Sequence, residues 1–235
     1  MLENFRRYPI GIQNFERLRN DNCVYVDKTS LIYKLANTNS TYFLSRPRRF
    51  GKSLLVSTLE AYFQGKKELF QGLAMETLEK EWTIYPVLHF DFSVSKYTTA
   101  DMLSAVINRQ LLLWEKTYKR EEGETTFSLR FEGIIRRAYK QTGKQVVVLI
   151  DEYDSPMLDS NNNDVVQKEI RNIMRDFFSP LKAQGQYLRF LLLTGISKFS
   201  QMSIFSELNN LQNISMSDDY HLRHHRTRAA YTVTN

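Results

Sequence analysis

The sequence contains few cysteines, glycines and prolines, and what it lacks excludes several classes of protein. Among its 235 residues Cys23 is the one cysteine, which leaves no internal disulfide and no thiolate metal site. Low-complexity segments and internal repeats are absent. No apolar run is long enough to cross a bilayer, and the first residues lack the apolar core of a secretory signal. We therefore expect a cytoplasmic protein without membrane contact.

What the chain does have is enough apolar sequence for one core, and a segment typical of phosphate binding. Hydrophobic residues make up 42% of the chain, which suits a single α/β domain. Thr41–Ser45 reads as a short buried strand, and the apolar residues of Lys52–Phe63 recur at helical spacing. The loop N–H groups and the helix N-terminus would meet a phosphate, Lys52 would add a full charge, and the Ser53 hydroxyl would ligate Mg²⁺. The tripeptide Gly51-Lys52-Ser53 is common by chance, so a second motif is needed to decide whether this segment binds a nucleotide.

Two adjacent carboxylates follow a second apolar strand. Val146–Asp154 is a continuous apolar run into Asp151 and Glu152, as in a strand buried on both faces of a parallel sheet. At the carboxyl edge of such a sheet Asp151 would hold Mg²⁺, and Glu152 would orient or deprotonate the attacking water. Thr194 ends a third apolar strand, Leu188–Ile196, where it would contact the γ-phosphate or that water. Alone, these residues fit a solvated acidic turn and a turn threonine. Together with the loop they predict a site for ATP and Mg²⁺.

Strands and helices alternate along the chain, which predicts a mostly parallel sheet with helices on both faces. We expect a strand at Asn22–Asp27 and a short helix at Thr29–Leu35 ahead of the loop. A further strand, Val87–Phe92, precedes the acidic strand. The other expected helical segments lie at residues 69–80, 101–120, 128–139 and 165–182, the last with Pro180 near its end. The pattern favours the three-layer α/β sandwich of P-loop NTPases.

Three arginines lie in the loop itself. Arg46 stands where the general phosphate-loop pattern has glycine, and Arg48 and Arg49 follow it. Their guanidinium groups would clamp the nucleotide, reach the γ-phosphate of a neighbouring subunit, or pair with acids of the same chain. The acids in question are Asp151, Asp154 and Glu60. A residue inside the loop is poorly placed to act in trans, which favours the structural or ground-state role. The expected nucleotide-binding residues are Arg48, Arg49, Phe50, Gly51, Lys52, Ser53 and Leu54, and the expected catalytic residues are Lys52, Glu152 and Thr194.

Four segments together resemble the AAA-ATPase-like family of prokaryotic proteins, and they are Tyr25–Thr29, Ser45–Ser53, Leu149–Asp154 and Thr194–Ser200. The resemblance covers roughly Pro9 to Tyr220. It accounts for Arg46, because the loop of that family similarly begins with Arg-Pro-Arg-Arg. It also adds Asp27 and Lys28 as residues of the family's amino-terminal signature. The resemblance implies the nucleotide, metal and catalytic roles that the residues themselves had suggested.

The resemblance also implies a branch of the P-loop ATPases. An additional strand, here Val87–Phe92, precedes the acidic strand, and Glu152 directly follows Asp151. These two traits are similar to the additional-strand type, which carries a catalytic glutamate. Complete members of the family resemble a fusion of this ATPase to a C-terminal domain of the PD-(D/E)XK nuclease type, and no such domain fits after Tyr220.

The charge of the chain raises a competing function. Its 32 Lys and Arg against 26 Asp and Glu give a formal charge of +6, which is a reason to consider nucleic-acid binding. The cations are spread among acids, however, and the aromatic residues lie in apolar strands and helices, so we expect no stacking platform. The predicted function is Mg²⁺-dependent ATP hydrolysis coupled to an unknown conformational output. A regulatory switch with little turnover, a nucleic-acid-associated adaptor and a homo-oligomer stay open as alternatives.

The composition changes after Tyr220. Residues 221–235 hold three of the four His and three Arg but no acid, and they lack an apolar helical or strand pattern. A metal-binding or nucleic-acid tail is one interpretation. We favour a lost reading frame, because permitted codons read one nucleotide later give a continuation that resembles the family. We therefore expect a P-loop domain at residues 1–220, with a lead-in strand and helix at 1–40 and a last strand near Asn213–Met216. Residues 221–235 would form a disordered tail.

Overall fold

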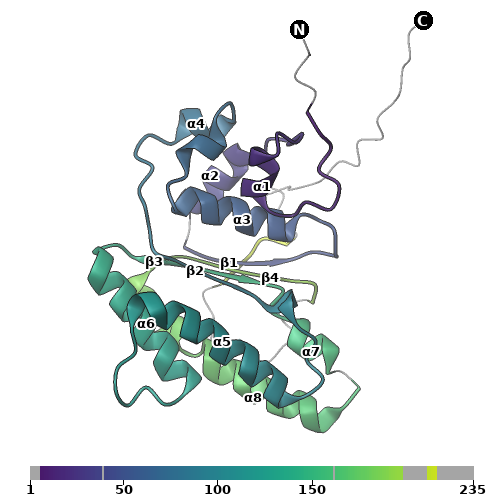
Figure 1. Ribbon diagram of the computed structural model, residues 1–235, viewed down its shortest axis with the longest axis vertical. Coiled ribbons are helices and arrows are strands. Elements are labelled where there is room, and N and C mark those ends of the chain that lie inside the picture. Colours follow the sequence, from purple (N-terminus) through teal and green to yellow (C-terminus); the bar gives the residue numbers. More distant parts are fainter. Residues whose placement is uncertain (1–5, 39, 161, 198–210, 216–235) are drawn as a thin grey trace, which may run out of the picture.

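The computed structural model describes residues 6–38, 40–160, 162–197 and 211–215 of the chain. These residues form a parallel five-stranded sheet between two layers of helices (Figure 1). The strands are β1 (Thr41–Ser45), β2 (Val87–Asp91), β3 (Val146–Asp151), β4 (Leu188–Gly195) and β5 (Gln212–Asn213). They lie side by side in the order β2-β3-β4-β1-β5. The expected α/β class and the parallel sheet with helices on both faces are confirmed.

One helical layer comes from the first third of the chain. It contains α1 (Phe15–Asn20), α2 (Thr29–Thr38), α3 (Lys52–Phe63), the 3-10 turn η1 (Lys67–Phe70) and α4 (Ala74–Leu78). Successive strand residues point to opposite faces of a sheet, so alternate residues of β1 serve the two layers. Tyr42 and Leu44 are buried in the core on the α3 side, whereas Phe43 is buried in the core on the other side.

The second layer covers the opposite face of the sheet (Figure 1). It contains η2 (Phe92–Val94), α5 (Ala100–Tyr118), α6 (Phe127–Thr142), α7 (Ser155–Asp159), α8 (Asp164–Phe178), α9 (Pro180–Ala183) and η3 (Gly185–Tyr187). Apolar side chains of α5, α6 and α8 pack against alternate residues of β3, such as Val148 and Ile150, which are fully buried. Because both faces are covered, β3 is apolar at every position before Asp151, as the sequence predicts.

Two local expectations are wrong. Residues 22–27 do not form a strand, since within the described part of the chain their one ladder contact is an isolated bridge between Arg7 and Cys23. The segment expected as one helix at 165–182 is two helices. Pro180 lacks the N–H that would continue α8, so that helix ends at Phe178 and Pro180 becomes the first residue of α9. The last strand, expected near residues 213–216, lies at Gln212–Asn213.

The strand order determines what can meet at the carboxyl edge of the sheet. β4 lies between β1 and β3, whereas β2, which we expected to be the additional strand, lies at the border of the sheet beside β3. The loop that we expect to bind phosphate follows β1, the two acids follow β3, and Thr194 ends β4. Since all these strands are parallel, the three features lie at one edge. The tail at residues 221–235 lies outside the described residues, so its boundary stays a prediction.

Candidate functional site

The loop between β1 and α3 turns sharply into the helix. Arg49 and Gly51 have φ angles of 68° and 75°, in the left-handed region, and Gly51 is the N-cap of α3. Such a conformation costs a residue with a β-carbon about 1–2 kcal/mol, whereas glycine adopts it freely. The loop is also fixed at its start, where the Arg46 amide donates to the Gly195 carbonyl at 3.0 Å. The first N–H groups of α3 therefore open toward the carboxyl edge of the sheet.

The Lys52 side chain bridges the loop and the acidic strand. It is 3% exposed, and its Nζ donates to the Arg46 carbonyl at 3.0 Å and to the Pro47 carbonyl at 3.4 Å. The same Nζ forms an ion pair with Glu152 Oε1 at 3.0 Å, and the Glu152 side chain is 16% exposed. A buried ammonium thus stands between loop carbonyls and a carboxylate, where a phosphate oxygen would be a competing partner.

Asp151 and Thr194 are brought together by the pairing of β3 with β4. The Thr194 hydroxyl donates to Asp151 Oδ1, and the Glu152 amide donates to the same oxygen at 3.1 Å. That amide also approaches Thr194 Oγ1 at 3.4 Å. Asp151 and Thr194 are both buried, and neither lines the groove that borders Glu152.

Glu152 is held in an unusual conformation and environment. Its φ angle of 51° is left-handed, and its backbone turns directly after β3. Burial raises the pKa of the Glu152 carboxyl, the hydrogen bond and charge of Lys52 lower it, and the charges of Asp151 and Asp154 raise it, with a net increase. A carboxylate whose pKa is raised is a stronger base than an ordinary glutamate.

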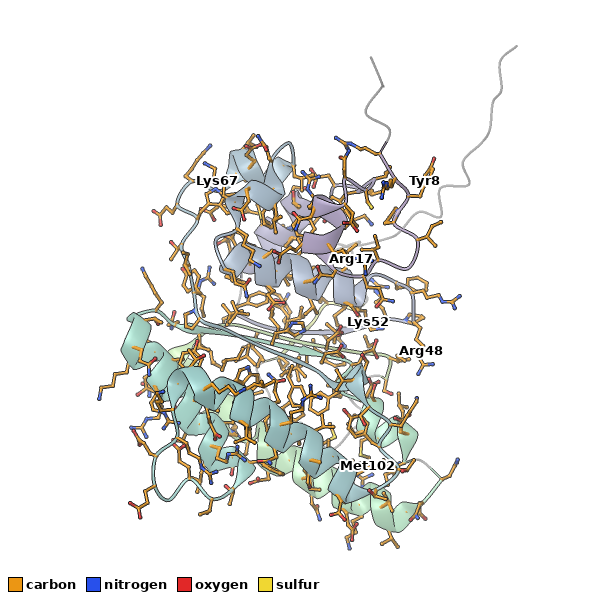
Figure 2. The ribbon with its side chains drawn as sticks, in the orientation of Figure 1. Tyr8, Arg17, Arg48, Lys52, Lys67 and Met102 are labelled. Carbon is orange, nitrogen blue, oxygen red and sulfur yellow. The ribbon has the colours of Figure 1, made fainter. Side chains whose placement is uncertain are left out.

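An open groove of about 960 Å³ runs past these residues, in the upper part of the range typical of small-molecule sites. Figure 2 shows Lys52 and Arg48 at the same edge of the sheet. Of the expected site residues, the groove is lined by Arg48, Arg49, Gly51, Lys52, Ser53, Leu54 and Glu152. It is also lined by Pro9, Ile10, Gly11, Ile12, Gln13, Ser93, Ser95, Lys96, Ser155, Leu158 and Asp159.

Comparison with known proteins places this chain in a family. A family model described as "Predicted AAA-ATPase" matches residues 9–205 of the chain. The chain belongs to the AAA-ATPase-like family. A protein of Azotobacter chroococcum mcd 1, described as an uncharacterized protein in the vnfD 5' region, is 40% identical over 217 residues. That match covers 92% of this chain and 42% of the relative, so the chain spans less than half of the relative's length. No solved structure matches the chain.

Asp27, which the resemblance to the AAA-ATPase-like family singled out, contacts the first residues of two helices. Asp27 Oδ1 accepts hydrogen bonds from the Thr29 amide at 2.8 Å and the Thr29 hydroxyl at 2.7 Å. Asp27 Oδ2 accepts from the Ala74 amide at 2.7 Å, and Thr29 Oγ1 accepts from the Met75 amide at 3.0 Å. The aspartate therefore satisfies donors at the first turns of both α2 and α4. Burial lowers the pKa of the neighbouring Lys28.

Asp154 is a structural residue whose partners the sequence did not reveal. It is buried, and its Oδ2 accepts from the Ile196 amide at 2.8 Å and from the Ser197 amide at 2.5 Å. The Tyr153 amide donates to the Thr194 carbonyl at 2.9 Å. Asp154 thus ties the turn after β3 to the end of β4. The adjacent Gly195 has no space for a side chain, since an added β-carbon would lie 2.5 Å from the Tyr153 ring.

The loop arginines and Phe50 are placed differently from one another. Arg48 and Arg49 are exposed on the wall of the groove. In the part of the chain that the structure describes, neither they nor Arg46 form an ion pair with Asp151, Asp154 or Glu60, which were the acids considered. Phe50, expected among the nucleotide-binding residues, lines instead a separate cavity of about 40 Å³, together with Tyr25 and Lys28.

Sequence reasoning missed two walls of the groove. Ser93, Ser95 and Lys96 follow the carboxyl end of β2, where Asp91 pairs in register with Asp151. The signal was available, because polar residues after a strand next to the acidic strand belong to the same edge. The other missed wall, Pro9–Gln13, has no such signal, since it does not follow a predicted strand of the sheet.

The donors available for a metal are oxygens. Within the described residues there is no group of three or more His, Cys, Asp or Glu side chains that could hold an ion. The Ser53 hydroxyl in the groove and the buried Asp151 carboxylate are hard oxygen donors, of the kind that Mg²⁺ takes in small number alongside phosphate and water. The described helices also include none that is long and apolar enough to cross a membrane.

Proposed function

We propose that the groove binds ATP with Mg²⁺ and that the protein hydrolyses ATP. One observation carries the proposal: Lys52 Nζ lies 3.0 Å from Glu152 Oε1, where the phosphate loop meets the acidic strand. A phosphate-binding cation and a general base that lie next to each other would face a γ-phosphate and its attacking water once the phosphate replaces Glu152 as the partner of Lys52. Membership of the AAA-ATPase-like family independently supports nucleotide binding.

In this proposal the loop and the start of α3 bind the phosphates. The N–H groups of the first turn of α3 point at the β-phosphate, and Lys52 exchanges Glu152 for phosphate oxygens. Arg48 and Arg49, exposed on the groove wall, neutralise ground-state phosphate charge from within the same chain. Ser53 and Asp151 would hold Mg²⁺, which offsets charge on the phosphates when bound.

Glu152 is the proposed general base. Once Lys52 turns to the phosphates, Glu152 is free to take a proton from water as the water oxygen bonds to the γ-phosphorus and the bond to the ADP oxygen breaks. Its raised pKa favours that proton transfer. Thr194, hydrogen-bonded to Asp151 and next to the Glu152 amide, orients the same turn. We further infer that β4, between β1 and β3, is the additional strand of the catalytic-glutamate type, in place of Val87–Asp91.

Two variants test binding and turnover separately. Lys52→Ala should lose ATP binding measured by calorimetry in Mg²⁺, because it deletes the one buried cation at the loop. Glu152→Gln should keep ATP binding and slow phosphate release by roughly 10²–10⁴-fold, as when a general base is removed. Lys67→Ala and Glu169→Gln change exposed residues of the same types outside the groove and should behave like the wild type.

The alternatives give different results in the same assays. A wild type that binds ATP but releases phosphate no faster than Glu152→Gln would be a regulatory switch. If Lys52→Ala leaves the affinity unchanged, the phosphate-loop assignment is wrong. Repeating the assay across protein concentrations, with and without DNA or RNA, would reveal a homo-oligomer or a nucleic-acid partner through its effect on the rate per molecule.

A further inference from the structure

We propose that Lys96 recognises the γ-phosphate of the bound nucleotide, exchanging its ion pair with Asp159 for a phosphate oxygen. The inference rests on the proposed function, because it assumes that the phosphates lie at the loop around Lys52. It deepens that function by naming the residue that distinguishes ATP from ADP at the site.

The order of the strands places Lys96 beyond the expected γ-phosphate. Along the carboxyl edge of the sheet, the proposed phosphate loop follows β1, Glu152 follows β3, and the segment with Lys96 follows β2. β2 borders β3 on the side away from β1 (Figure 1). A nucleotide with its β-phosphate at the start of α3 and its γ-phosphate near Glu152 would therefore extend its phosphates from β1 toward β2. The next side chains in that direction are those that follow β2.

The wall of the groove on the β2 side carries a single cation. Among the described residues that line the groove, the cations are Lys96 and three residues of the proposed phosphate loop, Arg48, Arg49 and Lys52. Lys52 would approach the γ-phosphate from the side of the loop. An ammonium on the opposite side would meet γ-phosphate oxygens that the loop does not contact, and ADP lacks those oxygens.

Lys96 is connected to the acidic turn through α7. Its Nζ forms an ion pair with Asp159 Oδ1 at 3.3 Å. Asp159 ends α7, which begins at Ser155, soon after Glu152, and rises about 6 Å over its length. Lysine has a flexible four-carbon stem, so its ammonium can move over a distance of that order. The Tyr97 amide donates to Asp159 Oδ2 at 3.2 Å, which keeps the backbone beside α7 when the lysine side chain leaves.

The ion pair can exchange at little cost. The Lys96 side chain is 78% exposed, and exposed ion pairs contribute little because water screens their charges. A terminal phosphate is a stronger partner for such an ammonium than one carboxylate. Lys52, by contrast, is 3% exposed and also donates to two loop carbonyls, so it would serve the phosphates of ATP and ADP alike.

The test compares ADP with the β,γ-imido analogue of ATP, which keeps the γ-phosphate and resists hydrolysis. Calorimetry in Mg²⁺ on the full chain gives both dissociation constants. Lys96→Ala should weaken binding of the analogue by roughly 5- to 20-fold, the loss expected for an exposed charge-assisted hydrogen bond, and change ADP binding less than about twofold. Lys96→Arg keeps a cation and should recover most of the loss.

Two further variants distinguish the released lysine from the ion pair itself. Asp159→Asn removes the charge that competes for Lys96 and keeps a carbonyl oxygen for the Tyr97 amide, so it should bind the analogue at least as tightly as the wild type. Lys116→Ala is the matched control, because Lys116 is also an exposed lysine of the second helical layer but does not line the groove. It should leave both affinities unchanged.

The inference is overturned if Lys96→Ala weakens both ligands equally or weakens neither. It is also overturned if Asp159→Asn weakens the analogue as strongly as Lys96→Ala does. In those cases nucleotide binding by the wild type, and with it the proposed function, would stand. A wild type that binds neither ligand would refute both.

Discussion

The ion pair of Lys52 with Glu152 joins the proposed phosphate-binding cation to the proposed general base. With both side chains largely buried, each satisfies the charge of the other in the absence of a ligand. A phosphate that takes over Lys52 leaves Glu152 without its cation, next to Asp151 and Asp154. Nucleotide binding would therefore raise the basicity of Glu152 at the moment when a base is needed.

The first prediction is the position of the acidic limb in the pH profile of phosphate release. Burial raises the pKa of Glu152, so as the pH falls the carboxylate becomes protonated earlier than an ordinary glutamate does. Only the deprotonated form accepts a proton. The rate of phosphate release should therefore be at its maximum above the raised pKa and fall as the pH drops through it. The residual activity of Glu152→Gln should lack this limb.

His89 is a second titratable group, and its contribution to the pH profile has to be distinguished from that of Glu152. Burial alone would lower its pKa, but the hydrogen bond to Glu60 at 2.9 Å and the charges of Glu60, Asp151 and Asp91 raise it overall. Because we assign the acidic limb to Glu152, His89→Gln should keep that limb at the same pH. A limb that disappears with His89 and persists in Glu152→Gln would contradict the assignment of the base.

The second prediction concerns Asp154, a buried carboxylate that accepts hydrogen bonds from the Ile196 and Ser197 amides. Asp154→Ala removes the acceptor of the Ile196 and Ser197 amides, which costs about 1–3 kcal/mol of unfolding free energy, measured in urea. The end of β4 carries Thr194, so turnover should fall on the order of tenfold while ATP affinity is kept. Asp154→Asn retains a carbonyl oxygen and should recover part of both losses. Equal damage from both variants would mean that the carboxylate charge itself is needed.

At the scale of elements, the sequence predicted best where one physical signal dominated. The bounds expected for β1 and α3 are those observed, because an apolar strand, a glycine with a left-handed φ and a periodic helix follow one another without competing signals. Residues 22–27 have strand-forming side chains, but among the described residues they find no neighbouring strand to pair with beyond the bridge at Cys23. Residues with high β-propensity form a strand only when another strand lies beside them to pair with. Whether such a strand is present depends on the whole fold, not on the local sequence.

The third prediction concerns the connection between α2 and α4. Asp27→Ala should lower the unfolding free energy by roughly 1–2 kcal/mol, because it removes the acceptor at the first turns of two helices at once. Urea unfolding measures the change. Asp101→Ala alters an exposed acid in the first turn of α5 and should change stability by less than about 0.5 kcal/mol. If both variants behave alike, the signature aspartate has a role other than joining α2 to α4.

For the whole molecule, the sequence predicted the part of the groove formed by the loop and the acidic strand, but not the segments on either side of it. Lys52, Ser53 and Glu152 belong to motifs whose spacing carries their chemistry. Ile10 and Ser155 line the same groove because two helical layers meet the carboxyl edge of one sheet, and no local pattern encodes that meeting. The strand order has the same origin, since β4 inserts between β1 and β3 although it follows both in the chain.

The last prediction uses this assembly from distant segments. The lead-in segment, the expected phosphate loop and the turn after β3 all line the groove, so a ligand there would bind the folded chain and not the unfolded one. At a free concentration 100 times its dissociation constant, ATP with Mg²⁺ should add about 2.7 kcal/mol, which raises the Tm of a chain of this size by about 5–10 °C. Differential scanning calorimetry measures the shift. Lys52→Ala should melt at the same temperature with and without ATP, whereas Lys67→Ala should shift like the wild type. An equal shift in Lys52→Ala would show that ATP stabilises the fold from somewhere other than this groove.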